Sequence, residues 1–258
     1  MTRKSLLGRL LLRVCVALLL AIGAIQQPAH GQDRTFSITG SAGYSLLSLG
    51  AVDDKNASDV VGWGNLGIPV SSFSSVKQSP LFSGRISYRF SREIAFSIYG
   101  SAFSKSVSSS YDGPDAMLHL DRSVGATDLS LSVAYYPAVQ PYFLQWYLQV
   151  NLGVLLARAS TKAVGTQNTK PAGVGIASSL VDSEGDYKKT KPDASFSVGA
   201  DVPLLAGMFL KGEAGYRFAQ MGQLEGDITQ YGVHSTETST TSFDFSGFMI
   251  SVGVGIEL

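Results

Sequence analysis

The feature that most constrains this chain is a two-residue alternation of apolar side chains with small or polar ones, which recurs in eight stretches. In the first stretch Phe36, Ile38 and Leu46 fall on one side of an extended backbone, while Ser37 and Thr39 fall on the other. Successive side chains of a β-strand point to opposite faces, so each stretch predicts a strand with one apolar face and one polar face. The stretches are residues 36–46, 82–90, 94–99, 128–135, 144–154, 195–202, 208–218 and 248–258.

The connections between these stretches alternate between short and long. The short ones are residues 91–93, 137–141 and 203–207, and the long ones are residues 47–78, 105–127, 160–193 and 219–242. Short turns at one end and long loops at the other are typical of antiparallel up-and-down barrels. A ten-strand version would need an extra hairpin inside a long loop, for instance at residues 173–181. We also expect the long loops to tolerate insertions near Asn56, Gly165 or Thr236.

The N-terminal residues predict export. Arg3, Lys4 and two further arginines precede an apolar run, and the small residues Ala29 and Gly31 follow it, as in a cleavable signal peptide. We expect residues 1–31 to be the signal peptide and residues 32–258 to form one barrel domain. The single cysteine, Cys15, lies in the first part, so disulfides and thiolate metal sites are not expected in the second.

The placement of charge decides which face is outside, because alternation alone also allows a soluble periplasmic barrel or sandwich. The charged residues in the central spans of the strands all lie on the polar face, four of each sign. Sparse, balanced charges among small residues are expected inside a narrow barrel, where an unpaired charge is costly. We call this set the interior charge network: Arg85, Arg89, Asp128, Asp201, Lys211, Glu213, Arg217 and Glu257.

Aromatic residues gather near the ends of the predicted strands, which suggests two girdles at the membrane interfaces. One set is Tyr88, Phe90, Tyr135, Tyr136, Tyr142 and Phe143, and the other is Tyr44, Phe82, Tyr216 and Phe218. The sequence therefore predicts an all-β, transmembrane antiparallel up-and-down β-barrel of about eight strands in the bacterial outer membrane.

The last stretch carries a resemblance to a known family. Val252, Val254, Ile256 and Leu258 form an alternating amphipathic strand that ends the sequence. This strand resembles the terminal recognition strand of outer-membrane barrels, although that family usually ends in an aromatic residue. From Phe36 onward the chain is similar to the small outer-membrane β-barrels of the OmpA transmembrane-domain and OmpX kind. The resemblance implies that the C-terminal strand is recognised by the barrel assembly machinery.

Enzymatic function has little support in the sequence. Acyl transfer or lipid deacylation would use a histidine and a serine, and after residue 31 the only histidines are His119 and His234. Both lie in long loops without a recognisable catalytic spacing. We therefore expect no enzyme activity, no cofactor and no metal site, and we keep an outer-membrane lipid-modifying enzyme as a minor alternative.

Five basic loop residues are candidates for contact with the phosphates of an outer-leaflet lipid or glycolipid: Arg158, Lys162, Lys188, Lys189 and Lys191. A solvated loop face is the alternative. Equal numbers of acidic and basic residues, 20 of each, argue against nucleic acid as a partner. We expect a monomer.

An eight-stranded barrel is just wide enough to be filled by its own side chains. The sequence therefore predicts a plugged polar interior and a role in membrane integrity or in surface recognition and adhesion. Porin-like passive transport of small solutes or small apolar ligands is the alternative. A route opening sideways through the wall would suit it, because Phe103 and Leu155 have the inward parity near the loop end.

Overall fold

A computed structural model describes residues 35–114, 116–141, 143–169, 176–204 and 207–258. The predicted signal peptide and its boundary with the barrel domain lie outside the described residues, so both stay predictions. Among the helices that the structure describes, none is both long and apolar enough to cross a membrane.

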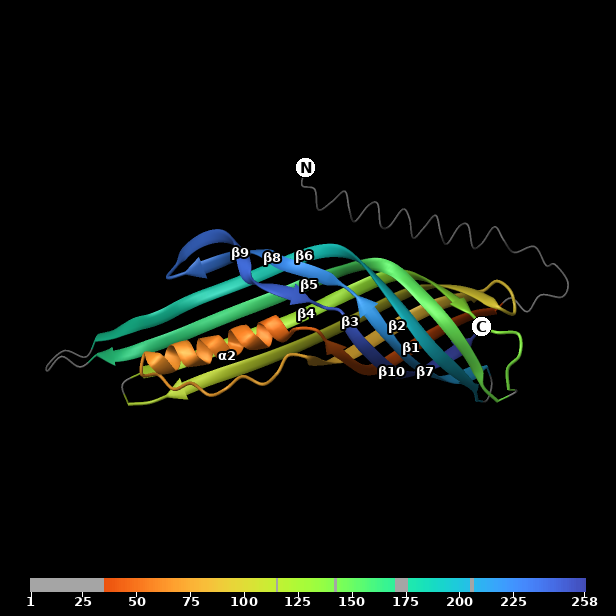
Figure 1. Cartoon of the computed structure of the whole chain (residues 1–258), viewed down its shortest axis with the longest axis horizontal. Coiled ribbons are helices and arrows are strands. Elements are labelled where there is room, and N and C mark those ends of the chain that lie inside the picture. The colour runs from red at the N-terminus through yellow and green to blue at the C-terminus, as the bar shows by residue number, and fades with distance from the viewer. Residues whose placement is uncertain (1–34, 115, 142, 170–175, 205–206) are drawn as a thin grey trace. The chain divides into compact units, whose positions relative to one another are not determined.

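Eight antiparallel strands close into a ring (Figure 1), which confirms the predicted fold class. In ring order they are β1 (Thr35–Leu47), β2 (Gln78–Arg89), β3 (Ile94–Asp112), β4 (Ala116–Tyr135), β5 (Gln145–Thr169), β6 (Ile176–Pro203), β7 (Met208–Phe218) and β10 (Gly247–Glu257). The pairing of β1 with β10 closes the ring, so no strand edge faces lipid over the paired span.

The side chains of the ring have the opposite arrangement to those of a water-soluble protein. Val150 on β5 is 48% exposed, whereas its neighbour Asn151 is buried. The same holds for Leu131 and Ser132 on β4. An outer surface of half-exposed apolar residues around a buried polar interior suits a surrounding of lipid. These side chains define a transmembrane β-barrel.

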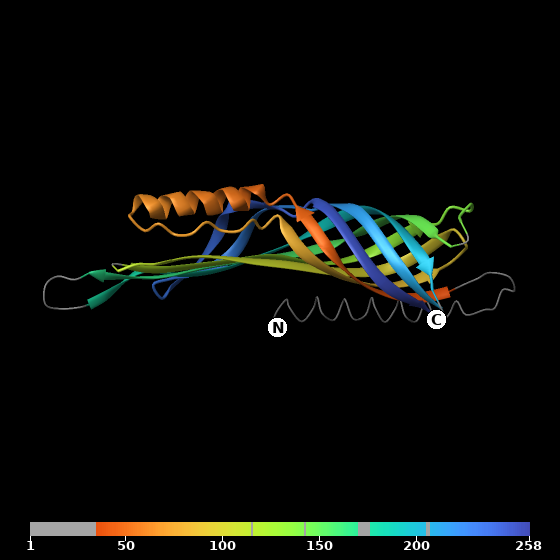
Figure 2. The same cartoon turned by 90° about the horizontal axis from the view of Figure 1, so that it is seen from below.

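Two of the four predicted long loops are mostly strand, so the loop prediction for residues 105–127 and 160–193 is wrong. β3, β4, β5 and β6 run on beyond the ring at its long-loop end and remain paired with each other there (Figure 2). We call these continuing parts the extension. They stay ordered because their hydrogen-bond ladders continue and because apolar residues such as Leu118 and Leu120 are covered on the inward face.

The other two long connections supply that cover. Residues 47–78 contain the helix α2 (Gly50–Asn65), which lies along the extension (Figure 2), and residues 219–242 contain most of a hairpin, β8 (Gln220–Gln230) and β9 (Val233–Asp244). β8 pairs with β6 beyond the point where β7 ends. The sheet therefore has ten strands but the ring has eight, and the two additional strands are β8 and β9. Of the position predicted for an extra hairpin, residues 176–181 belong to β6, and residues 173–175 lie outside the described residues.

The helix α2 and the ordered extension also overturn part of the prediction about insertions. Asn56 is only 3% exposed and Gly165 is buried within β5, so neither position lies in a free loop. Thr236 is exposed near the tip of the β8–β9 hairpin, where an insertion is still expected to be tolerated.

An apolar cluster fills the ring at its long-loop end. Its largest fully buried members come from separated parts of the chain and include Leu155, Met221, Leu224 and Phe245. Phe103 packs against Phe245 with ring centroids 5.6 Å apart. We call this cluster the apolar cap, because it lies between the ring interior and the extension.

Candidate functional site

The interior charge network spans the ring from one wall to the other. Arg85 on β2 donates from Nη2 to both carboxylate oxygens of Glu213 on β7, at 2.8 and 3.1 Å. Tyr147 on β5 donates its hydroxyl to Oε2 of Glu213 at 2.9 Å. The Arg85 guanidinium also lies over the ring of Tyr99. A buried carboxylate with three such bonds has its charge compensated without water.

A second ion pair lies beside the first. Lys211 on β7 donates to Oδ1 of Asp201 on β6 at 3.0 Å, and both side chains are buried. The Tyr136 hydroxyl donates to the other oxygen of Asp201 at 3.3 Å, and the Lys211 ammonium lies 4.2 Å from the centroid of the Tyr147 ring. Aromatic faces therefore take the place of water around the cation.

The third cluster lies directly below the apolar cap. Arg217 on β7 is fully buried and lies between two carboxylates, with Nη2 3.3 Å from Asp128 and Nε 3.7 Å from Asp193. Ser101 accepts from Arg217 at 2.8 Å. The Arg217 guanidinium lies over the Phe103 ring, which belongs to the cap. The Arg217 guanidinium thus compensates the negative charge of both carboxylates.

Two members of the network lie at the mouth at the short-turn end. Arg89 is half-buried, donates to Gln145 at 3.1 Å and lies over the Tyr136 ring. Glu257 is exposed, so it is not part of the buried interior. Both line a cavity of about 20 Å³, which leaves very little free volume at this level of the ring.

The aromatic girdle prediction needs one correction. Tyr136 does not face lipid, because its side chain is buried and packs on Tyr147 inside the ring, with centroids 5.2 Å apart. Tyr142 lies outside the described residues. Among the remaining predicted members, Phe90, Tyr135, Phe143, Tyr44, Phe82 and Phe218 are exposed, while Tyr88 and Tyr216 are half-buried.

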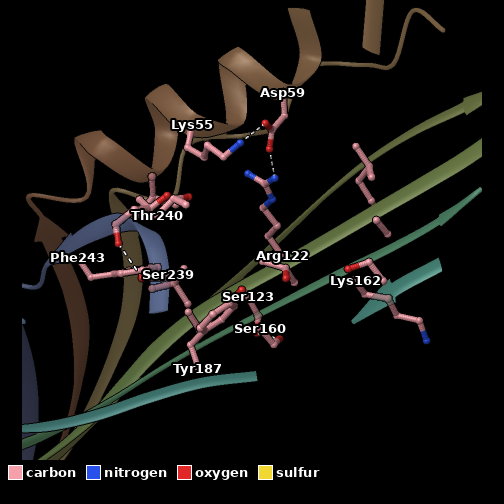
Figure 3. A pocket seen from close by; sticks show the side chains of 18 residues that line it. Lys55, Asp59, Arg122, Ser123, Ser160, Lys162, Tyr187, Ser239, Thr240 and Phe243 are labelled. Atoms are coloured by element: carbon pink, nitrogen blue, oxygen red, sulfur yellow. Dashed lines mark hydrogen bonds and ion pairs between the residues drawn. The ribbon is translucent and has the colours of Figure 1, made fainter. Parts of the chain in front are cut away.

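A pocket of about 260 Å³ opens between α2, the extension and β9 (Figure 3). We call it the loop-end pocket. Its floor is apolar and includes Val124, Ala159 and Phe243, which also belong to the apolar cap. Hydroxyl groups from several strands surround that floor, among them those of Tyr187 and Ser239. The pocket therefore combines an apolar base with polar walls.

An ionic clasp holds α2 over this pocket (Figure 3). Arg122 on β4 donates to Asn56 and to Asp59 on α2, and Lys55 also donates to Asp59. Burial of the Asp59 carboxyl opposes its ionisation, but the hydrogen bonds from Lys55 and Arg122 outweigh burial and lower the pKa of Asp59 below its ordinary value. Asp53 on α2 accepts a hydrogen bond from the backbone N–H of Val76 at 3.0 Å, which fixes the segment between α2 and β2.

The five predicted lipid-contacting residues do not share one face. Arg158, Lys162 and Lys188 are exposed on the outer face of the extension, and Lys162 points away from α2 in Figure 3. The positions of Lys189 and Lys191 have the opposite parity. Their ammonium groups donate to the backbone carbonyls of Gln223 and Gln220, at 2.5 and 3.3 Å. Only the first three can therefore meet lipid.

The two histidines lie on strands and not in loops. His119 on β4 is 3.0 Å from Asp121, and His234 on β9 is 2.7 Å from the Thr229 hydroxyl. Within the described ranges no hydrogen bond joins either histidine to a serine. The same part of the chain holds no group of three His, Cys, Asp or Glu side chains that could bind a metal ion.

Sequence reasoning missed two components of these sites. Asp193 was placed at the end of a loop, but β6 carries it into the barrel beside Arg217. The loop-end pocket was missed because α2 was not expected. A signal was present, since Val52, Asn56, Val60 and Trp63 follow a helical spacing, and these are the α2 residues that pack inward.

A closed eight-stranded ring, lipid-facing outside and charge-paired inside, defines a small outer-membrane β-barrel. Comparison with solved structures finds proteins of this class. Neisserial surface protein A is 16% identical, with 87% of this chain and 97% of that chain covered and a TM-score of 0.41. The outer membrane protein OprG of Pseudomonas aeruginosa is 13% identical, with 88% and 97% covered and a TM-score of 0.44. A major outer membrane protein of Thermus thermophilus is 10% identical, with 87% and 99% covered and a TM-score of 0.45. No family model matches the sequence, and no curated protein matches it.

Proposed function

We propose that this barrel is closed to solutes and that it recognises a small ligand at the cell surface through the loop-end pocket. The observation that carries the proposal is the filling of the ring at two levels. The interior charge network leaves a cavity of only about 20 Å³ near the short-turn end, and the apolar cap fills the opposite end. A water-filled channel would form only if the side chains of the interior charge network and those of the apolar cap both moved.

The lining of the loop-end pocket favours a small molecule that has both apolar and hydroxyl surfaces, such as a sugar unit. Ser183, Thr161 and Thr241 offer hydroxyl groups around the apolar floor. The charged groups of the clasp already bond one another, so they do not favour a strongly charged ligand. In this barrel class long loops face the cell exterior, which would present the pocket to the surroundings.

Ion conductance in planar bilayers separates recognition from passive transport. We expect no steady single-channel current from the wild-type barrel. Phe103→Ala and Leu155→Ala open the apolar cap, and combining them with Tyr147→Ala, which opens the level of the interior charge network, should raise the current and serves as the positive control. Steady channels in the wild type would favour the transport alternative over the closed barrel.

Saturation-transfer NMR with a panel of neutral and anionic mono- and disaccharides tests the pocket itself. Ser183→Phe places a ring in the pocket and should abolish binding of any sugar that the wild type binds. Thr166→Phe, on the outer face of β5 away from the pocket, is the matched control and should leave binding unchanged. Failure of every sugar to bind, or equal loss in both variants, would reject recognition at this pocket.

A further inference from the structure

A second hollow lies on the opposite, outward face of the wall, and it is not connected with the recognition role proposed above. Its volume is about 400 Å³, and it lies across β2, β3, β4 and β5. We call it the wall hollow. Its sides are Phe82 on β2 and Leu156 on β5, both exposed large side chains.

Strand register explains why the wall is recessed there. Phe82, Ala102, Thr127 and Leu156 are consecutive cross-strand partners, so two small residues stand between two large ones. In the next row of outward-facing residues toward the long-loop end, Ser104 pairs with Gly125, and Gly125 pairs with Arg158. Gly125 cannot bear a side chain in this backbone, because an added Cβ would lie 2.9 Å from the carbonyl oxygen of Phe103. The floor of the hollow therefore consists of small residues and lies below the side chains of Phe82 and Leu156.

The hollow lies at the level where the apolar band ends. Along β5 the outward residues from Trp146 to Leu156 are all apolar, and Arg158 is the first polar one. Ten residues of tilted strand rise about 25 Å, which matches the apolar band of outer-membrane barrels. Arg158 therefore lies at the height of lipid phosphates, and the hollow lies beside the upper parts of the acyl chains.

Charge at the upper rim of the hollow is positive and partly uncompensated. Arg158 lines the hollow, is exposed, and makes no ion pair or side-chain hydrogen bond within the part of the chain that the structure describes. Its cross-strand partner is Lys188, which is paired with Asp186 at 2.5 Å. Lys162, farther out on the same face, has Asp121 and Glu184 as its cross-strand partners. Among these three cations, Arg158 therefore has the least compensation from acids of the described strands.

We propose that the wall hollow binds a phosphate-bearing membrane lipid, with an acyl chain in the hollow and the phosphate on Arg158. An apolar recess below an uncompensated guanidinium matches the two halves of such a lipid. A guanidinium binds phosphate through two parallel hydrogen bonds, and the geometry here leaves both of its outer nitrogens available. The occupant is a lipid of the surrounding membrane and not a second copy of the chain.

The test measures how many lipids stay bound to the purified full barrel by native mass spectrometry. The probes are phosphatidylglycerol, the uncharged diacylglycerol with the same chains, and inorganic phosphate. We expect the wild type to retain phosphatidylglycerol selectively and Arg158→Gln to weaken its retention by about tenfold, the effect of losing a charge-assisted hydrogen-bond pair. Lys162→Gln is the matched control and should retain the lipid like the wild type.

A second variant tests the acyl-chain half. Thr127→Leu fills the hollow with an outward side chain that a lipid-facing strand accommodates, so the barrel should still fold. It should lower the retention of phosphatidylglycerol and leave the weak binding of inorganic phosphate unchanged. Equal retention by wild type, Arg158→Gln and Thr127→Leu would overturn the proposal. Binding of inorganic phosphate as tight as that of the lipid, or a dimer that competes with lipid, would also overturn it.

Discussion

At the scale of single residues, the stability of the barrel interior depends on the sharing of Arg217 between two acids. Arg217 has no exposed surface and compensates both Asp128 and Asp193, whereas Arg85 and Lys211 each face one main acid. Breaking a buried ion pair by removing one partner typically costs about 3–5 kcal/mol, because the other charge stays in the low-dielectric interior. The two acids beside Arg217 make this position the most sensitive one in the network.

We expect Arg217→Met to lower the free energy of unfolding by about 3–5 kcal/mol, measured by urea titration in lipid vesicles. Adding Asp193→Asn should recover part of the loss, since one of the two uncompensated acids is then neutral. Arg89→Met is the control, because Arg89 is half-buried at the mouth and its loss should cost less. An Arg217→Met barrel as stable as the Arg89→Met barrel would contradict the shared-cation account.

At the scale of elements, the ionic clasp decides whether α2 stays on the extension. The pKa of Asp59 is lowered in the folded protein, so ionisation of Asp59 stabilises the docked helix. This stabilisation is present above the ordinary pKa of 3.8 and is lost as the pH falls through the lower folded value. The helix itself contains three glycines and buries few residues, so tertiary contacts have to hold it.

Trp63 on α2 reports this docking when Trp146 is replaced by Phe, because these are the two tryptophans of the chain. We expect the fluorescence of Trp63 to shift toward that of a solvated ring as the pH falls below the ordinary pKa of 3.8. Asp59→Asn should show a looser helix at neutral pH and a weaker pH dependence. Asp54→Asn, an exposed acid on the same helix, should behave like the parent. A pH response that is the same in all three proteins would exclude Asp59 as its origin.

At the scale of the whole molecule, the inside-out arrangement of the ring predicts where a new charge is tolerated. Val150→Arg places a cation against the middle of the apolar band and should cost about 2–4 kcal/mol in a bilayer. Thr166→Arg lies on the same strand and the same face but beyond the band, so it should change the free energy of unfolding by less than about 0.5 kcal/mol. Unfolding in lipid vesicles measures both, and equal costs would contradict a lipid contact at Val150.

The sequence by itself determined the eight ring strands and the face that each presents, because a strand has a period of two and because charge is costly against lipid. Residues such as Val150 and Glu213 carry that signal locally. Only the tertiary structure decided which charges meet, since Arg85 and Glu213 are 128 positions apart and the curvature of the ring brings them together. The tertiary structure also decided that a loop-end pocket forms, because its lining comes from α2, β9 and the extension. Helix α2 and the β8–β9 hairpin have weak local signals, and they become ordered because the extension offers them an apolar surface to cover.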